Sequence, residues 1–292
     1  HPIAQQFWEA LERVNSCKSV YSLYWEQFIP IQNHSQDQHK EMQRLFRLAR
    51  SRNSLDFLSQ LLLDFGIMYL ESDVNPREKV GAFNVIITKL EERGLSHSNL
   101  AVLCYNNRAR ANHDARRLSQ AKDDYTKCIN IDRTFASAYY NRAITFDYQR
   151  DYASAIKDYT TAIEFNPMYS RAYNNRGICY NAMKQFDLAL VDYTKALEIE
   201  PDYVKAWSNR AITYYFKKDY ENAIADTKRT LELDPCYCNA HFNQGLCYKL
   251  LGQQVLALRS FNSALMLKPQ DSYSKVKSTV LYHILDACRD PL

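Results

Sequence analysis

Glycine, proline and long apolar segments are scarce in this chain of 292 residues, which contains 6 Gly and 8 Pro. So few helix-breaking residues predict long helices joined by short turns. The longest apolar run, within LLLDFGIMYL at 61–70, is interrupted by Asp64 and is too short to span a bilayer. No signal peptide is visible, and because the chain begins with His1 we expect a fragment of a longer protein. Membrane insertion is not predicted.

An excess of one charge sign is also lacking, since 37 Lys and Arg against 33 Asp and Glu leave a net charge of +4. This balance predicts no nucleic-acid partner, because helical arrays that bind RNA need a strongly basic face. Residue patterns for catalysis are missing as well: the seven His are scattered, without a Gly-rich phosphate loop or a Ser-His-Asp arrangement. The sequence therefore predicts no enzyme and no cofactor. The alternative is a targeting or regulatory accessory domain of a larger enzyme.

The eight cysteines predict neither disulfides nor a metal site. Cys236, Cys238 and His241 lie close in the sequence, but three ligands in a turn fall short of a structural metal site. A chain of stacked helices without an export signal does not need disulfides, so we expect a reducing, cytoplasmic setting. Three other cysteines occupy positions where small core residues recur, and there a free thiol acts as a small apolar group: Cys128, Cys179 and Cys247.

What the chain has in abundance is internal repetition with a period of 34 residues. Prolines follow this step at Pro167, Pro201, Pro235 and Pro269. Three further columns share it: small residues at Ala109, Ala143, Gly177, Ala211 and Gly245; alanines at Ala121, Ala155, Ala189, Ala223 and Ala257; and mostly bulky residues at Tyr125, Tyr159, Tyr193, Thr227 and Phe261. Agreement over this many copies predicts a repeated structural unit.

Each copy is predicted to contain two antiparallel helices. In 137–149 apolar residues recur at three- and four-residue spacing, as they do on one face of a helix. After a break at 150–152 the same spacing continues through 155–163. Pro167 then ends the second helix, because proline cannot continue one. We expect such pairs at about 102–135, 136–169, 170–203, 204–237 and 238–271.

The frame W/Y–x–N–R–A/G–x₂–Y…Y–x₂–A–x₃–Y–x₂–A–x₄–P resembles the tetratricopeptide repeat, a 34-residue helix–turn–helix family, over about 99–271. The resemblance implies an all-α fold, a right-handed α-solenoid of stacked antiparallel helix pairs in which the first helix of each pair lines the concave face. It implies no single function, because these repeats serve as partner-binding surfaces in many unrelated systems.

The two ends of the chain depart from the repeat. Residues 1–98 are predicted to be a helical region of degenerate, repeat-like helix pairs, and Asn75-Pro76 is a good helix start. Residues 272–292 are predicted to form a capping helix, over 272–288, and a tail, with the five repeats in 99–271 between these ends. The helices expected before the repeats are 3–14, 18–28, 36–51, 55–71 and 77–92.

An Asn-Arg pair recurs at the same place in AYYNRAI, AYNNRGI and AWSNRAI. At about 100° per residue, the Arg falls on the packing side of its helix. The Arg column and an Asp column of the second helix change together: Arg108, Arg142, Arg176 and Arg210 go with Asp124, Asp158, Asp192 and Asp226, whereas the last copy has Gln244 and Ser260. We therefore predict an Arg–Asp bridge inside each repeat. The alternative is that these arginines bind an acidic ligand.

The Asn of the pair points away from the packing side and is present in every copy. A carboxamide offers one acceptor and two donors, so a column of carboxamides is predicted to pair with the backbone of an extended peptide. The compatible alternative is that each Asn bonds a neighbouring helix and orders the stack. The predicted peptide-binding groove consists of this column and other residues of the same face: Asn107, Asn141, Asn175, Asn209, Asn243, Tyr140, Tyr148, Arg171, Lys205, Tyr215, Phe216 and Phe242.

The predicted function is a protein–protein interaction scaffold or adaptor that binds an extended peptide or a helix of a partner protein in the concave groove, within a multiprotein complex. Binding of an acidic C-terminal chaperone tail is the alternative. That subclass needs Lys and Arg one turn apart on a late first helix. Here Lys205 is followed by Asn209 and Arg171 by Asn175, so the clamp is incomplete.

Overall fold

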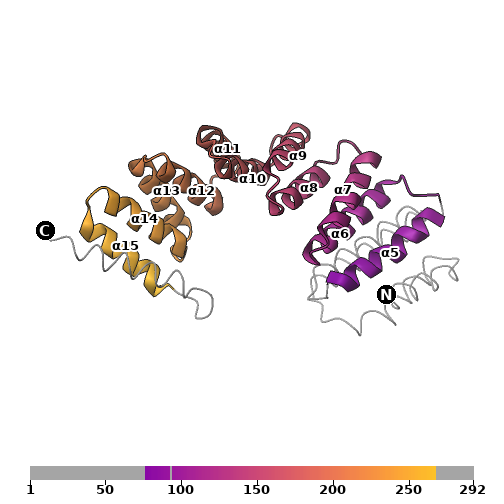
Figure 1. Cartoon of the computed structure of the whole chain (residues 1–292), viewed down its shortest axis with the longest axis horizontal. Helices are drawn as coiled ribbons and strands as arrows, with labels where there is room; N and C mark the ends of the chain where they lie inside the picture. Colours follow the sequence, from indigo (N-terminus) through magenta and orange to yellow (C-terminus); the bar gives the residue numbers. More distant parts are fainter. Residues whose placement is uncertain (1–75, 93, 268–292) are drawn as a thin grey trace, which may run out of the picture. The chain divides into compact units, whose positions relative to one another are not determined.

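A computed structural model describes residues 76–92 and 94–267 of the chain. Across these ranges the chain forms α-helices joined by turns, without a strand (Figure 1). None of the described helices is long and apolar enough to cross a membrane. The capping helix expected at 272–288 and all but the last of the helices expected before the repeats lie outside the described residues. That last one is present from Pro76, as the Asn-Pro start predicts.

The chain divides into two compact units, His1–Thr145 and Phe146–Leu292, with the boundary inside one helix. The first unit contains α5 (Pro76–Glu92), α6 (Asn99–Asp114), α7 (Leu118–Ile131) and most of α8 (Ala136–Tyr148). The second contains α9 (Tyr152–Phe165), α10 (Ser170–Ala182), α11 (Phe186–Ile199), α12 (Val204–Phe216), α13 (Tyr220–Leu233), α14 (Cys238–Leu250) and α15 (Gln254–Met266). Two helices thus lie within the described part of each expected repeat, except that α6 begins three residues before 102.

The helices pack as consecutive pairs, and the pairs stack. In the first unit α6 packs between α5 and α7. In the second unit α10 packs on α11, α12 on α13 and α14 on α15, and successive pairs meet where α11 contacts α12 and α13 contacts α14. The first helices of neighbouring pairs also touch directly, α10 with α12 and α12 with α14. The arrangement is an all-α solenoid of stacked helix pairs.

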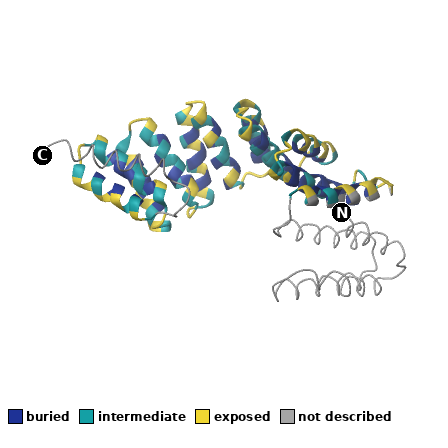
Figure 2. Ribbon diagram, turned by 60° about the horizontal axis from the view of Figure 1, so that its bottom comes forward, coloured by how far each residue is buried: buried dark blue, intermediate teal, exposed yellow. Residues whose placement is uncertain are grey.

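Small residues of the first helix make room for buried rings of the second. The bulky column contains four fully buried rings, among them Tyr193 and Phe261, and buried residues concentrate where helices face one another (Figure 2). A Cβ atom added to Gly177 would lie 2.8 Å from Cε1 of Tyr193, and one added to Gly245 would lie 2.5 Å from Cε1 of Phe261. At these two positions the first helix can approach the ring only because it carries no side chain.

The turn inside each repeat places its middle residue in the left-handed backbone region, where glycine is normally favoured. The φ angles are 62° at Arg116, 62° at Arg150, 60° at Lys184, 64° at Lys218 and 72° at Gly252. A residue with a Cβ atom is disfavoured there by about 1–2 kcal/mol. A cation beside the C-terminus of a helix offsets part of that through the helix dipole.

Lys184→Gly should therefore raise the free energy of unfolding, by about 0.5–1 kcal/mol, because relief of the left-handed strain exceeds the lost dipole interaction. Urea unfolding followed by circular dichroism measures the change. Lys157→Gly is the matched control: Lys157 is exposed inside α9, and glycine there should lower stability by about 1 kcal/mol. A loss of stability in Lys184→Gly would show that the lysine itself supports the turn.

The cysteines of the small columns face the core, as predicted. Cys128, Cys179 and Cys247 are buried, and Cys104 on α6 is buried as well. Burial raises the pKa of the Cys104 and Cys247 thiols to about 12. These thiols are therefore protonated at neutral pH, which suits a small apolar filler and not a nucleophile.

Iodoacetamide at pH 7.5 should modify Cys236 well before these four cysteines, because Cys236 is exposed and alkylation requires an accessible thiolate. Peptide mass spectrometry over a time course reports the order. Raising the pH to 9 should leave Cys104 and Cys247 unmodified in the folded protein, whereas unfolding in urea should make all of them react. Modification of Cys104 at the rate of Cys236 in the folded state would contradict this packing.

Candidate partner-binding surface

The predicted bridge between the two helices of a repeat is present. Arg176 donates from Nε to Asp192 Oδ2 at 2.8 Å and from Nη2 to Oδ1 at 2.7 Å. Arg210 makes the same two bonds to Asp226, at 2.7 and 2.8 Å. Both carboxylates are buried, and a bidentate guanidinium pair is the geometry that best compensates such burial. Arg176–Asp192 and Arg210–Asp226 confirm the prediction at these repeats.

In the first unit Arg108 pairs with Asp124 in the same way, at 2.8 and 2.5 Å. Arg142 belongs to the first unit and Asp158 to the second, so the bridge predicted between them stays a prediction. In the last repeat, where both charges are absent, Ser260 Oγ donates to Gln244 Oε1 at 3.1 Å. A neutral hydrogen bond thus occupies the place of the ion pair.

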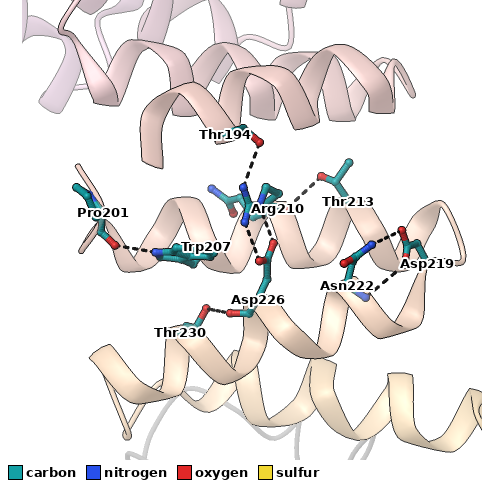
Figure 3. Close-up of polar contacts among 10 residues, drawn as sticks. Thr194, Pro201, Trp207, Arg210, Thr213, Asp219, Asn222, Asp226 and Thr230 are labelled. Atoms are coloured by element: carbon teal, nitrogen blue, oxygen red, sulfur yellow. Dashed lines mark hydrogen bonds and ion pairs between the residues drawn. The ribbon is translucent and has the colours of Figure 1, made fainter. Parts of the chain in front are cut away.

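Three of the arginines also reach back to the preceding repeat, a contact that the 34-residue period does not indicate. The third nitrogen, Nη1, donates to a threonine on the second helix of that repeat. Figure 3 shows Arg210 between Thr194 and Asp226, so that one guanidinium ties three helices together. The bonds are Arg142 to Thr126 at 3.0 Å, Arg176 to Thr160 at 2.9 Å and Arg210 to Thr194 at 3.1 Å.

An aromatic ring one turn earlier covers each guanidinium. Arg210 Cζ lies 4.7 Å from the centre of the Trp207 ring, and Arg176 Cζ lies 5.6 Å from that of Tyr173. Burial lowers the pKa of Arg176 and the Asp192 carboxylate raises it, and the carboxylate prevails. The donors of Arg176 and Arg210 are directed into the stack. The Arg column is therefore structural, and the alternative of an acidic ligand bound by it finds no support here.

Two asparagines of the column, Asn141 and Asn209, form hydrogen bonds with the preceding repeat. Asn209 Nδ2 donates to Asn174 Oδ1 at 2.9 Å, and Asn141 Nδ2 donates to Asn106 Oδ1 at 3.1 Å. In both cases the acceptor belongs to the preceding repeat. Asn141 and Asn209 are half-buried. At these two positions the asparagine links neighbouring repeats while part of its carboxamide stays accessible.

The other members of the column differ in accessibility. Asn175 and Asn243 are half-buried, and Asn175 Oδ1 accepts a bond of 3.0 Å from Asn174 Nδ2. Asn107 is buried, with 3% of its surface exposed, and so offers a ligand the least access of the five. The 34-residue period predicts one direction for all five, but the neighbouring residues decide how much of each amide is left open.

The aromatic residues predicted for the same face are also unequal. Phe216 and Tyr148 are exposed, at 56% and 53%. Phe242 and Tyr215 are half-buried, the first against Phe261 with ring centres 5.8 Å apart and the second edge-on to Phe216 at 5.7 Å. Tyr140 is half-buried as well. Of these predicted aromatic residues, the two most exposed therefore lie at the C-terminal ends of α8 and α12.

Phe216 contacts Phe186, a residue that the sequence did not indicate as part of this face. Its ring stacks on Phe186 of the preceding repeat, with centres 6.0 Å apart and planes 10° apart. The residues that follow them, Lys217 and Asp187, form an ion pair across the same junction. An exposed ring fixed in this way is a rigid contact surface, because it has little rotamer freedom left to lose on binding.

Two cations complete this face. Arg171 and Lys205 are exposed at the starts of α10 and α12, one turn before Asn175 and Asn209. In the second unit α10 touches α12, and Asn209 is linked to Asn175 by hydrogen bonds through Asn174. We call this face the ladder surface and define it as Arg171, Asn175, Lys205, Asn209 and Phe216.

Comparisons with known proteins agree with this architecture. Tetratricopeptide repeat family profiles match residues 136–169, 170–203 and 204–235, and a further one matches 103–135. A search among curated proteins found no match to the sequence. Both sets of matched residues begin within a few positions of the helix pairs described above.

Solved structures of similar fold include three proteins of low sequence identity. YrrB, described as a tetratricopeptide repeat protein with an unusual peptide-binding site, has a TM-score of 0.55 at 19% identity, over 70% of this chain and 98% of its own. MamA from Desulfovibrio magneticus has a TM-score of 0.55 at 19% identity, over 59% and 97%. Pseudomonas aeruginosa PilF has a TM-score of 0.54 at 17% identity, over 64% and 86%. With the helix pairs, the residue columns and the profile matches in agreement, residues 103–235 of the chain consist of tetratricopeptide repeats.

Proposed function

We propose that this protein is an interaction scaffold that binds an extended segment of a partner protein on the ladder surface. The observation that carries the proposal is Asn209. Its carboxamide is half-buried, donates one N–H to the stack and has no partner for Oδ1 within the described part of the chain. A backbone-binding site requires an amide that is fixed in orientation and still has hydrogen-bonding capacity left for a ligand.

The two ends of the ladder surface suit different side chains. Lys205 lies near the N-terminus of α12 and Phe216 at its C-terminus, eleven residues later. At about 1.5 Å per residue the two positions are roughly 16 Å apart along the helix, the length of about five residues of extended peptide. We infer a partner segment with an acidic side chain at one end and a bulky apolar side chain about five residues away.

Among the solved structures of this fold, the description of YrrB includes a peptide-binding site, which is compatible with a peptide ligand here. An incomplete carboxylate clamp does not favour a chaperone tail, because Asn209 stands where that clamp needs Arg. A cytoplasmic location and membership of a multiprotein complex remain proposals drawn from the sequence.

Selection of phage-displayed random twelve-residue peptides on the wild-type chain tests the proposal. Selected peptides should bind with micromolar affinity in fluorescence anisotropy. Asn209→Ala should weaken binding about two- to tenfold, which corresponds to one hydrogen bond of about 0.5–1.5 kcal/mol. Phe216→Ala should weaken peptide binding more, because Phe216 is the apolar residue of the ladder surface and its ring is exposed.

Asn262→Ala is the matched control, since Asn262 is an exposed asparagine on α15 away from the ladder surface. Melting temperatures of all variants must be compared, because Asn209 also links two repeats. Peptides that bind Asn209→Ala and Phe216→Ala as tightly as the wild type would place the binding site elsewhere on the molecule.

A further inference from the structure

Three asparagines of the second unit form a continuous hydrogen-bond chain. Asn209 Nδ2 donates to Asn174 Oδ1 at 2.9 Å, and Asn174 Nδ2 donates to Asn175 Oδ1 at 3.0 Å. Asn174 is buried, with 2% of its surface exposed, whereas Asn175 and Asn209 are half-buried on the ladder surface. The buried amide therefore contacts two surface amides at once, one on its own helix and one on the next repeat.

The buried asparagine is present in some of the repeats only. The residue before the Asn of the repeated column is Asn106, Tyr140, Asn174, Ser208 or Phe242. At two of these positions it is an asparagine that accepts a bond from the column Asn of the following repeat: Asn106 from Asn141, and Asn174 from Asn209. The 34-residue period alone does not predict this contact, since it joins residues 35 apart.

We propose that Asn174 is a positioning residue of the ladder surface, and that it holds the Asn209 carboxamide with its N–H inward and its Oδ1 outward. This inference rests on the proposed function. A carboxamide without such a partner can turn by 180° and present either a donor or an acceptor. With Asn174 accepting a bond from one of its two N–H groups, Asn209 keeps Oδ1 as an outward acceptor. The group that this oxygen takes from the partner is a hydrogen-bond donor, the backbone N–H of an extended peptide.

The backbone of α12 supports the same orientation. Thr213 Oγ1 donates to the carbonyl oxygen of Asn209 at 3.0 Å, one turn further along the helix. The equivalent pair in the first unit is Thr145 and Asn141, at 3.1 Å. Both asparagines that bond a buried asparagine thus also have a threonine on their carbonyl group, so the two positions are built alike.

The Asn174→Leu variant tests the positioning role, because the leucine side chain branches at the same atom but neither accepts nor donates a hydrogen bond. In the ¹⁵N-labelled chain, the Asn209 side-chain amide is assigned by its loss in Asn209→Ala. In Asn174→Leu we expect a shifted Asn209 signal and at least fivefold faster hydrogen exchange of its Nδ2 protons. Asn174→Asp, which retains an acceptor for Asn209, should restore most of the protection. Asn106→Leu, the same change in the first unit, is the control and should leave the Asn209 signal unchanged.

The donor role is tested with the tightest peptide from the phage selection, synthesised with a methyl group on one backbone nitrogen at a time. On the wild type one methylated position should weaken binding about five- to tenfold, the worth of one hydrogen bond of about 1–1.4 kcal/mol. On Asn209→Ala the same methyl group should have no effect, and on Asn174→Leu its effect should fall below twofold.

The outcomes separate the two proposals. An Asn209 amide that is unaffected by Asn174→Leu overturns the positioning role, whether or not peptides bind. A released amide together with equal methylation effects on the wild type and Asn209→Ala overturns the donor role and leaves the proposed function standing. If no peptide is selected, the proposed function fails and the donor role fails with it, while the exchange experiment still decides what Asn174 does.

Discussion

Asp192→Ala should lower the free energy of unfolding by about 3–5 kcal/mol, since it leaves the Arg176 guanidinium partly buried without its carboxylate. Two of the nitrogens of Arg176 donate to Asp192, at 2.8 and 2.7 Å, and only Nη1 would keep its partner, Thr160. The pair lies between α10 and α11, where water has little access to replace the lost oxygens. Urea unfolding of the wild type and the variant, followed by circular dichroism, gives the difference.

The last repeat supplies the matched control. Replacing both partners, Arg176→Gln with Asp192→Ser, copies the Gln244–Ser260 pair that this chain already uses at the equivalent place. The double variant should recover at least half of the stability lost in Asp192→Ala, because no charge is left without a partner. A double variant that is less stable than Asp192→Ala would mean that the ion pair itself, and not the stranded cation, accounts for the loss.

The repeat frame and the ion pairs were predictable because each depends on one period. Small, bulky and proline columns at 34 residues place the helix pairs, and the joint loss of charge at Gln244 and Ser260 is enough to identify Arg176 and Asp192 as partners. Such pairs lie within one repeat, 16 residues apart. The distance between the partners follows from two antiparallel helices joined by a short turn. The residue pattern predicts both the helices and the turn.

The contacts between repeats were not predictable in the same way. The bonds from Arg210 to Thr194 and from Asn209 to Asn174 depend on how far one helix pair is shifted and rotated against the next. No residue column specifies that shift and rotation. The sequence therefore does not show whether a side chain contacts the residue 34 positions away or the one 35 positions away. Asn107, assigned to the surface by the helical wheel, is buried, which the 34-residue period does not predict.

These contacts connect stability with the proposed function. The guanidinium of Arg210 fixes the position of α12 relative to α11 and α13. The adjacent residue, Asn209, is thereby placed within hydrogen-bond distance of Asn174 on α10. On the proposed function, Asn-Arg recurs because the Arg sets the packing of the helices and the Asn before it binds the partner from that fixed position. Weakening of the Arg link is therefore expected to disturb the ladder surface, whereas loss of an exposed ladder residue such as Lys205 leaves the stack intact.

Tyr193→Ala should have an effect of similar size to Asp192→Ala, a loss of about 3–5 kcal/mol in the free energy of unfolding. The Tyr193 ring is fully buried between α10 and α11. Gly177 lies so close to it that a Cβ there would meet Cε1 at 2.8 Å. With no side chain at Gly177 to move into the space, the backbone of α10 has nothing with which to fill the cavity.

Comparison of Tyr193→Ala with Tyr193→Phe separates the contribution of ring packing from that of the hydroxyl group. Tyr193→Phe keeps the ring and should lose no more than about 1 kcal/mol. Gly177→Val overfills the same space and should lose about 1–3 kcal/mol. In Tyr193→Ala the valine has room, so adding Gly177→Val to it should restore stability and not lower it further. Additive losses in that double variant would show that the two positions do not share one space, and that the small column serves helix approach alone.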